Sequence, residues 1–356
     1  MLNDIKQTPA SLKALLETHI SLNKVVKGIN LPLNPNDIGQ IYVIASGSSR
    51  NAANIAKYFI EKVAKLSVIV DFAGEFAHRS PVVSSNDLLI PLSQSGETAD
   101  VLAALNKGRE LSMQVFSITN NLDSTIHKLS DSGMVVQAGA EESIPATKSF
   151  TCQLMSLYVL GIYLAEMRKT LPVEEIEFLK RNLLGIPALI YENIETFSEK
   201  INAAADKVKD FKNLAVLGRG QNWALAEEFA LKVQETSYIN AFGWAAGEFM
   251  HGHLAVLDEN FPVVSLLTKT FDGSENYDLA IKNTKEIKTK RTPILIAIGH
   301  NSVDFADVFV NIGEQNGITT LFSTALILQL LAFKIADLLD KDVSKPRSLN
   351  KTVLNE

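Results

Sequence analysis

Residues 87–98 read Asp87-Leu88-Leu89-Ile90-Pro91-Leu92-Ser93-Gln94-Ser95-Gly96-Glu97-Thr98. An apolar run passes directly into a polar turn, and the residues after it, 98–111, have the pattern of an amphipathic helix. A short buried strand, a Gly/Ser turn and a helix form the unit from which parallel sheets are built. This stretch therefore predicts a strand whose carboxyl end opens onto a polar turn and a helix.

The same unit recurs on both sides of this stretch. Residues 41–45 are apolar and precede a helical pattern over 50–65, and residues 115–119 form another apolar run with a helix after it. A helix is also expected over 9–27, with Thr8 as its N-cap and Pro9 at its first position. Strands that alternate with helices predict an α/β fold, in which helices cover both faces of a parallel sheet.

The second half of the chain repeats the first. The run Leu214 to Gly220 is followed by a helical pattern over 222–236, and the apolar helix near 150–165 has a counterpart near 323–338. Matches at nearly one offset indicate an internal repeat. We therefore predict two three-layer αβα domains in tandem, over 1–175 and 200–339, joined through a charged helical stretch and followed by a tail over 340–356.

The composition of the chain excludes several classes of function. The 356 residues carry a net charge of −6, which argues against a nucleic-acid partner, and 46% of them are apolar, as in ordinary globular proteins. The single cysteine, Cys152, excludes a disulfide framework within one chain. The first residues lack a signal peptide, so we expect a cytoplasmic protein without a membrane segment.

Two serine-rich turns are the candidate ligand site. The turn 93–98 offers hydroxyls, an amide and the N–H groups of a helix start, and the turn 46–49 (Ser46-Gly47-Ser48-Ser49) offers a similar set after the first strand. Such donors at the carboxyl ends of neighbouring strands suit a phosphate. The alternative is a helix-capping turn with Ser95 as N-cap. Two such turns favour phosphate binding over capping.

Other phosphate motifs are not met. Gly218-Arg219-Gly220 follows a strand, but Trp223 stands where a dinucleotide fold has its third glycine, and no acidic residue follows at the ribose position. A Walker loop would need Gly-Lys-Ser/Thr after a glycine turn, and neither turn has it.

On the helix over 222–236, Glu228, Lys232 and Glu235 fall on one face. Carboxylates beside a lysine at the mouth of a sheet could move a proton between adjacent carbons of an open-chain sugar. The alternative is a solvated stripe with one ion pair, worth about 0.3 to 0.5 kcal/mol.

The segment 242–253 reads as an aromatic, glycine-rich loop with two histidines. His251 is a candidate proton-transfer group, because the ordinary pKa of histidine lies near neutrality. Glu248, His251 and His253 could mimic a metal cluster, but three ligands in one short loop are weak evidence and we expect no metal. A histidine that only pins the loop stays an alternative.

Several of these motifs occur together in one known family. The chain resembles the sugar isomerase (SIS) family, and within it the isomerase half of glutamine-fructose-6-phosphate aminotransferases. The resemblance covers nearly the whole chain and rests on the segments 93–98, 146–150, 217–220, 232–238, 246–252 and 345–351.

The resemblance implies roles for individual residues. Glu235 would move the C1/C2 proton with support from Glu228 and Lys232, and His251 would open the sugar ring, often in the neighbouring subunit's site, which implies a homodimer. Lys351 would engage the open-chain carbonyl, and the tail would fold over the pocket. No cofactor is implied. Together with the donor argument, the phosphate is assigned to Gly47, Ser48, Ser49, Ser93, Gln94, Ser95 and Thr98.

The departures from the aminotransferases direct the functional prediction. Met1-Leu2 leads straight into the isomerase portion, without the glutaminase part, Ala146 replaces a serine and His253 stands where a proline is usual. This form is similar to isomerase-type glucosamine-6-phosphate deaminases, so we expect glucosamine 6-phosphate to be converted to fructose 6-phosphate and ammonia. Alternatives are a fructosamine-6-phosphate deglycase, a galactosamine-6-phosphate deaminase/isomerase, an ammonia-dependent aminotransferase and a non-catalytic sugar-phosphate sensor.

Overall fold

The computed structural model describes residues 1–271 and 273–351, and these fall into two compact units, each built around one sheet. The first-sheet unit comprises Thr8–Glu141 and Lys148–Pro187, together with Asn350 and Lys351. The second-sheet unit comprises Met1–Gln7, Glu142–Thr147 and Ala188–Leu349. The predicted ranges 1–175, 200–339 and 340–356 stay predictions, and residues 352–356 of the last lie outside the described residues.

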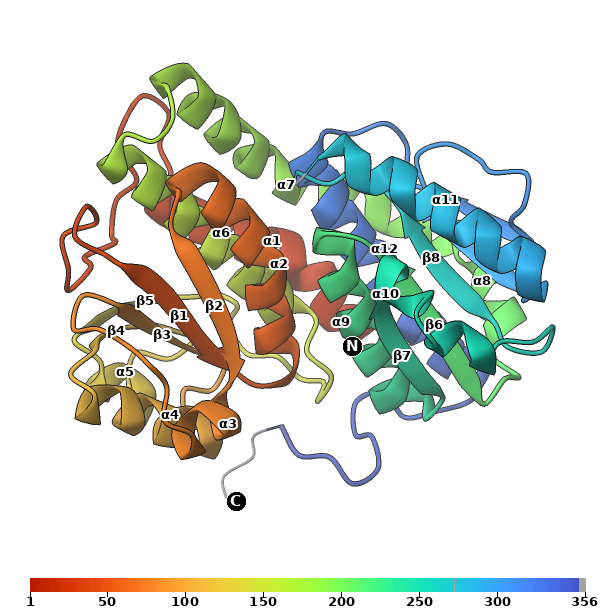
Figure 1. Cartoon of the computed structure of the whole chain (residues 1–356), viewed down its shortest axis with the longest axis horizontal. Helices are drawn as coiled ribbons and strands as arrows, with labels where there is room; N and C mark the ends of the chain where they lie inside the picture. The colour runs from red at the N-terminus through yellow and green to blue at the C-terminus, as the bar shows by residue number, and fades with distance from the viewer. Residues whose placement is uncertain (272, 352–356) are drawn as a thin grey trace. The chain divides into compact units, whose positions relative to one another are not determined.

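The first sheet has five parallel strands in the order β2-β1-β3-β4-β5 (Figure 1). Strand β3 is buried along its whole length, as expected of a strand covered on both faces. Because β1 lies between β2 and β3, the order of the strands reverses at β1. The strands are β1 (Gln40–Ala45), β2 (Ser67–Phe72), β3 (Leu88–Ser93), β4 (Gln114–Thr119) and β5 (Ser132–Val135).

Helices cover both faces of this sheet. On one face α2 (Gly47–Ala64) packs against α6 (Lys148–Arg168), with the ring of Phe59 stacked on Tyr158 at 4.1 Å between centroids. The other face packs against α3 (Ala73–His78), α4 (Ala99–Glu110) and α5 (Thr125–Leu129), and the core there includes Phe76, Leu105 and Ile126. The predicted three-layer αβα architecture is confirmed in this unit.

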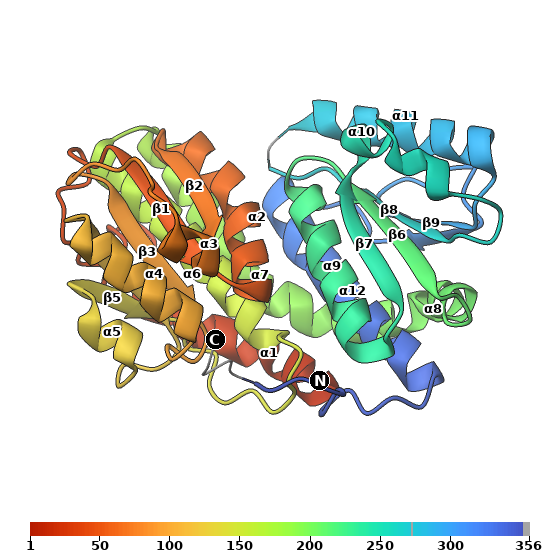
Figure 2. The same ribbon diagram turned by 60° about the horizontal axis from the view of Figure 1, so that its bottom comes forward.

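The second sheet is also five-stranded and parallel, in the order β10-β9-β8-β6-β7 (Figure 2). Read from β7, this is the order of the first sheet with each strand replaced by its counterpart, so the internal repeat predicted from the sequence is confirmed. The strands are β6 (Asn213–Gly218), β7 (Asn240–Ala245), β8 (Val263–Leu267), β9 (Leu295–Gly299) and β10 (Val308–Asn311).

The helices of the second-sheet unit again lie on two faces. On one face α9 (Gln221–Ser237) and α8 (Asn202–Val208) contact α12 (Gly317–Leu338). On the other, α10 (Ala246–Phe249) and α11 (Ser274–Arg291) close a core that includes Leu217, Phe249 and Ile287. A short 3₁₀ turn, His253–Val256, follows α10.

Two helices, α6 and α12, are long and apolar enough to cross a membrane by length and composition. Most of each apolar window is buried within the fold, 89% for α6 and 83% for α12. A mostly buried apolar helix is typical of the core of an α/β protein, and these two correspond to the apolar helices recognised in the sequence.

The N-terminal helix differs from its prediction. Helix α1 spans Leu2–His19, so Thr8 and Pro9 lie inside it and the predicted 9–27 range is wrong. The helix starts early because Asp4 lies in its first turn and accepts hydrogen bonds from Glu142 N and from Ser143. It stops at His19, whose ring and carbonyl both bond to Lys27.

The charged helical stretch expected between the two domains is two helices, α7 (Val173–Lys200) and α8. Helix α7 contains Pro187, which lies at the boundary between the two units.

Candidate active site

The two serine-rich turns lie next to each other at the point where the strand order of the first sheet reverses. Ile44 of β1 is paired with Pro91 of β3, so Ser46 and Ser93, each two residues further on, reach the same edge. The carboxyl ends of the strands that flank such a reversal form the ligand-binding crevice of open α/β sheets. The prediction that the turns are neighbours is confirmed.

The first turn is the start of a helix, which extends its supply of donors. Helix α2 begins at Gly47, whose φ of +54° suits glycine, and not near residue 50 as predicted. Ser46 precedes it in an extended conformation and does not cap it with its side chain. The first turn contains no acidic residue, so the N–H groups of Gly47, Ser48 and Ser49 are available to an anion.

The second turn is held by its own hydrogen bonds. Ser93 Oγ accepts from Gly96 N at 3.1 Å and shares a 3.0 Å bond with Thr98 Oγ1, and Ser95 Oγ accepts from Glu97 N. Two hydroxyls that share one bond keep one proton to donate outward. Helix α4 begins only at Ala99 and its N-cap is Thr98, so the alternative with Ser95 as N-cap is wrong.

Gly96 is required for this arrangement. Its φ is +71°, and a Cβ atom there would lie 2.2 Å from Ser124 Oγ. The turn is also bonded to the next loops, since Ile126 N donates to Gly96 O and Thr125 N donates to Glu97 Oε1. The donors of the turn are thus fixed before any ligand arrives.

The equivalent crevice of the second sheet, after β6 and β8, is closed by the protein itself. Asn222, in the first turn of α9, donates to Thr268 O and accepts from Thr268 Oγ1, both at 3.0 Å. A Cβ at Gly218 would lie 2.2 Å from Asn222 O, which shows how closely the helix approaches the strand. The repeat therefore preserves the fold, whereas the serine-rich turns lie in the first-sheet unit.

The three charged residues of α9 form a buried cluster. Lys232 is only 1% exposed, its Nζ bonds to the Glu235 carboxylate and lies 3.6 Å from Glu228 Oε1. The Glu228 side chain is 5% exposed and that of Glu235 is 19% exposed. A solvated stripe would be far more exposed, so that alternative is wrong. Glu235 is therefore the member of the cluster that reaches solvent, and it shares the Lys232 ammonium with Glu228.

Glu235 lines a cavity of about 450 Å³. The cavity lies at the C-terminal end of α9, which leads into the start of β7, so Glu235 is not at the carboxyl edge of its sheet as the sequence argument assumed. The other lining residues are Leu231, Gln234, Tyr238, Ile239, Asn240, Arg347, Ser348 and Leu349.

The segment predicted as a loop over 242–253 is more ordered than expected. Residues up to Ala245 belong to β7, which pairs with β6, and α10 follows. The strand was missed because Gly243 interrupts its pattern; the glycine is needed because a Cβ would lie 2.4 Å from the backbone of Glu227 in α9.

The two histidines of this segment have different surroundings. His253 stacks on Trp244 with 3.7 Å between ring centroids, so it pins the turn. His251 is exposed, and its backbone N–H bonds to Glu248 O. Among residues 1–271 and 273–351, no three His, Cys, Asp or Glu side chains gather in a way that could hold a metal ion.

Lys351 bonds to a residue that the sequence argument did not identify. Its Nζ donates to Glu141 Oε2 at 2.7 Å, and the Glu141 side chain is fully buried. Ser149, in the first turn of α6, donates to the same carboxylate through Oγ at 2.6 Å and through its backbone N–H. Glu141 lies five residues before Ala146, just outside the motif 146–150. Its closeness to that motif is the one feature of the sequence that could have indicated it as a site residue.

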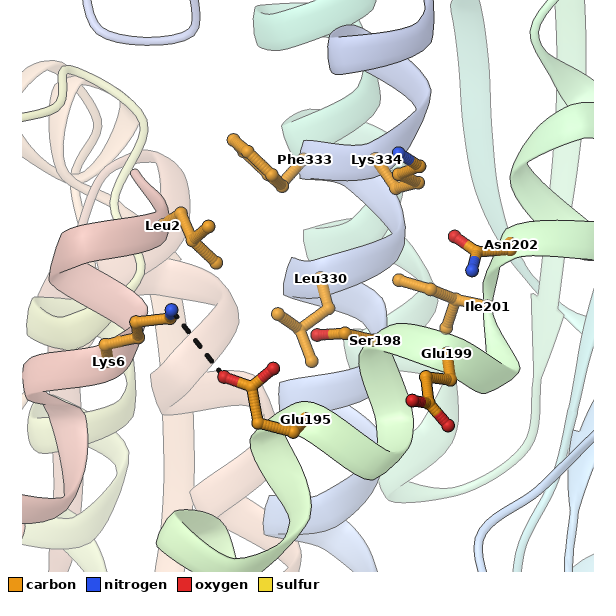
Figure 3. Close-up of a pocket in the computed structure, with 10 residues that line it drawn as sticks. All are labelled: Leu2, Lys6, Glu195, Ser198, Glu199, Ile201, Asn202, Leu330, Phe333 and Lys334. Carbon is orange, nitrogen blue, oxygen red and sulfur yellow. Dashed lines mark ion pairs between the residues drawn. The ribbon is translucent and has the colours of Figure 1, made fainter.

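A further cavity, of about 290 Å³, lies in the second-sheet unit and contains none of the predicted site residues. Figure 3 shows two apolar residues of its lining, Leu330 and Phe333, and the Lys6–Glu195 ion pair at one side, which measures 3.6 Å. Of the two cavities, the one beside Glu235 coincides with a predicted catalytic residue.

Comparison with known proteins agrees with these features. The SIS domain family matches residues 36–163 and 207–333, one match on each sheet. The glutamine–fructose-6-phosphate aminotransferase (isomerizing) of Clostridium acetobutylicum is 35% identical over 362 aligned positions, which cover all of this chain and 59% of the relative. The chain thus spans about three-fifths of the length of that relative.

Solved structures are similar to this chain over nearly its whole length. The C-terminal domain of glucosamine-fructose-6-phosphate aminotransferase from Francisella tularensis is 28% identical, with a TM-score of 0.89 and 97% of both chains covered. Glucosamine-6-phosphate deaminase from Thermotoga maritima has the same fold, with a TM-score of 0.73, 24% identity, and 99% of this chain and 98% of that one covered. Two SIS domain matches over more than half of the sequence establish that this chain belongs to the SIS domain family.

Proposed function

We propose that the chain is an amino-sugar phosphate deaminase/isomerase that converts glucosamine 6-phosphate and water to fructose 6-phosphate and ammonia. The observation that carries the proposal is the Glu235–Lys232–Glu228 cluster. It places one partly exposed carboxylate on a buried ion pair beside a cavity, in a chain of the SIS domain family.

The phosphate is assigned to the serine-rich turns. Helix N–H groups without a neighbouring carboxylate and a pre-formed hydroxyl turn suit a dianion, and the reversal point of the sheet is the expected place for it. A phosphate held there would leave the sugar's carbonyl end to other groups.

Proton transfer is assigned to Glu235. In the open-chain amino sugar it takes the proton from C2 and returns it to C1, while a second proton passes from the amine nitrogen to O1, which leaves an imine at C2. Water then adds to C2 and ammonia leaves, giving the ketose. Lys232 holds Glu235 in place and balances its charge, because the ammonium contacts both carboxylates. His251, which is exposed, is assigned ring opening. A homodimer and a cytoplasmic location stay predictions.

Amination of fructose 6-phosphate by ammonia is the second candidate. It is the same proton transfer in reverse, and it is favoured by the 35% identity to an aminotransferase. A deglycase and a galactosamine-6-phosphate deaminase would share the serine-rich turns and the Glu235 cluster, since their substrates differ from glucosamine 6-phosphate in carrying the amine at C1 or in the configuration at a distal carbon.

The test incubates the purified protein with glucosamine 6-phosphate and measures ammonia and fructose 6-phosphate, and separately supplies fructose 6-phosphate with ammonium. Galactosamine and fructosamine 6-phosphates are assayed in parallel. Turnover of galactosamine 6-phosphate or fructosamine 6-phosphate alone would refute glucosamine 6-phosphate as the substrate, but it would still support an amino-sugar phosphate enzyme. No turnover in any arm would refute an amino-sugar enzyme.

Proton transfer is tested without ammonia. In D₂O, the wild-type protein should introduce deuterium at C1 of fructose 6-phosphate, and Glu235→Gln should not. Glu192→Gln, which removes an exposed carboxylate of α7, is the matched control and should exchange like wild type. Exchange by Glu235→Gln at the wild-type rate would show that another group moves the proton.

A further inference from the structure

The Glu141–Lys351 pair belongs to a connected set of hydrogen bonds within the first-sheet unit. The Glu141 side chain is fully buried, while that of Lys351 is 30% exposed, so the carboxylate is the fixed partner and the lysine the one that could move. The carboxylate is fixed by Ser149 at the start of α6, a helix of 21 residues whose positive end favours a negative charge. Lys351 is therefore held at a defined point of the unit.

That point is linked to the serine-rich turn 93–98 through Asn120. The Asn120 N–H donates to Gln94 O at 3.2 Å, directly from the end of β4 to the turn after β3. Its side chain then accepts from Ala138 N and donates to Gly139 O, both at 2.8 Å. Gly139 is two residues before Glu141, so three successive strand ends are tied together at the carboxyl edge of the first sheet.

Other charged groups near Glu141 do not replace Lys351. Lys148 is 2% exposed and its Nζ donates to Ala140 O at 2.6 Å, and the Cys152 thiol is buried, which together with the Glu141 charge raises its pKa. Neither group can reach solvent, whereas Lys351 can.

We propose that Glu141 is a positioning residue for Lys351, and that Asn120 keeps Glu141 in register with the phosphate-binding turn. In the proposed function, on which this inference rests for its kinetic part, the lysine has to meet the carbonyl end of a sugar whose phosphate is held by that turn. A buried carboxylate hydrogen-bonded to the same edge of the sheet fixes the distance between the two. Glu141 itself need not touch the substrate.

The first test measures the lysine directly and needs no substrate. Brief acetylation with acetic anhydride, followed by peptide mapping, gives the rate of modification of Lys351, with Lys341 and Lys345 as internal references. In Glu141→Gln the rate at Lys351 should rise several-fold, because the ammonium loses the carboxylate that holds it. Glu142→Gln, which removes the exposed neighbouring carboxylate, is the matched control and should match wild type.

The second test measures turnover of whichever sugar phosphate the enzyme accepts. In Glu141→Gln, kcat should fall about 10- to 100-fold with KM changed little, since a displacement of about 1 Å costs that order of rate while the phosphate turn is unchanged. Glu141→Asp should recover part of kcat. A purely structural Glu141 would lower the yield of folded protein without the selective rise in Lys351 acetylation.

Asn120→Ala keeps the proposal testable if Glu141→Gln does not fold, because Asn120 is only half-buried. In Asn120→Ala, Lys351 should be acetylated faster and kcat should fall, each by less than in Glu141→Gln. Wild-type acetylation of Lys351 and wild-type kcat in the folded variants would overturn the proposal. Since acetylation is read without turnover, its result is independent of whether glucosamine 6-phosphate is the substrate.

Discussion

Tyr238 holds Arg347 in two ways. The Arg347 backbone N–H donates to the Tyr238 hydroxyl at 3.0 Å, and the Arg347 guanidinium lies over the Tyr238 ring at 4.2 Å from its centroid. Tyr238 ends α9 three residues after Glu235, and both contacts lie within the second-sheet unit. The chain that leads to Lys351 is thus attached to the helix that carries the proposed proton carrier.

This attachment predicts that Tyr238→Ala exposes the C-terminal segment to protease. A hydrogen bond and a cation–π contact are each worth about 1 kcal/mol, so their joint loss should raise the rate of tryptic cleavage after Arg347 about thirtyfold. Tyr238→Phe, which keeps the ring, should have a smaller effect. Tyr191→Ala, which removes an exposed tyrosine of α7, should cleave like wild type; equal rates in all variants would refute the attachment.

The tight surroundings of Gly96 predict that a substitution there disturbs the serine-rich turn. Gly96→Ala adds a Cβ atom where Ser124 Oγ would be 2.2 Å away, at a φ of +71°. We expect a loss of about 2 to 4 kcal/mol in the free energy of unfolding from overpacking and backbone strain together. Binding of fructose 6-phosphate, measured by calorimetry, should weaken at least tenfold.

Gly139→Ala is the matched control for that variant. Gly139 has a similar φ of +65°, but a Cβ there meets no atom within 4 Å. It should lose about 1 kcal/mol, from backbone strain alone. If the two variants were equally stable and bound sugar phosphate equally well, the contact with Ser124 would not matter.

The repeat and the serine-rich turns could be predicted from the sequence because short apolar strands followed by Gly/Ser turns are local patterns. Strand β7 could not, since Gly243 is there for the close approach of α9, a contact between distant elements that no local pattern encodes. The start of α1 depends in the same way on bonds between Asp4 and Ser143. Glu141 was missed because one buried carboxylate carries no motif of its own.

The buried position of Lys232 predicts that its loss destabilises the fold. It is 1% exposed between two carboxylates, so Lys232→Met leaves buried negative charges without their partner. Breaking a buried ion pair in this way costs about 3 to 5 kcal/mol, which urea unfolding would measure. Lys13→Met, which breaks an exposed pair with Glu17 of 3.8 Å, should change stability by less than about 0.5 kcal/mol. A loss below about 1 kcal/mol for Lys232→Met would contradict burial of the cluster.

Asp4 predicts a dependence of stability on pH. Its burial would raise the pKa of the carboxyl, but hydrogen bonds from Glu142 N and from Ser143 outweigh burial and hold the pKa below its ordinary value. A carboxyl with a lowered native pKa stabilises the fold at pH values above its unfolded pKa, about 4. This stabilisation is lost as the pH falls through the lower native pKa.

Asp4→Asn tests that sign. The variant should be less stable than wild type at pH 7, and the difference should shrink as the pH is lowered to about 3 and below. Asp37→Asn, which changes an exposed carboxyl, should follow the wild-type curve. A difference that stays constant over this range would mean that the native pKa of Asp4 is not lowered.

His251 predicts that two inactive variants restore activity when combined. If His251 acts in the partner's site, a mixed dimer of Glu235→Gln and His251→Asn subunits has one site with both changes and one site with neither. Random mixing gives mixed dimers for half of the molecules, so about a quarter of wild-type activity should return after joint refolding. If His251 acts in its own subunit, every site carries one change and no activity returns. The control uses His253→Asn in place of His251→Asn. His253 is stacked on Trp244, so this variant should lose stability before it loses turnover.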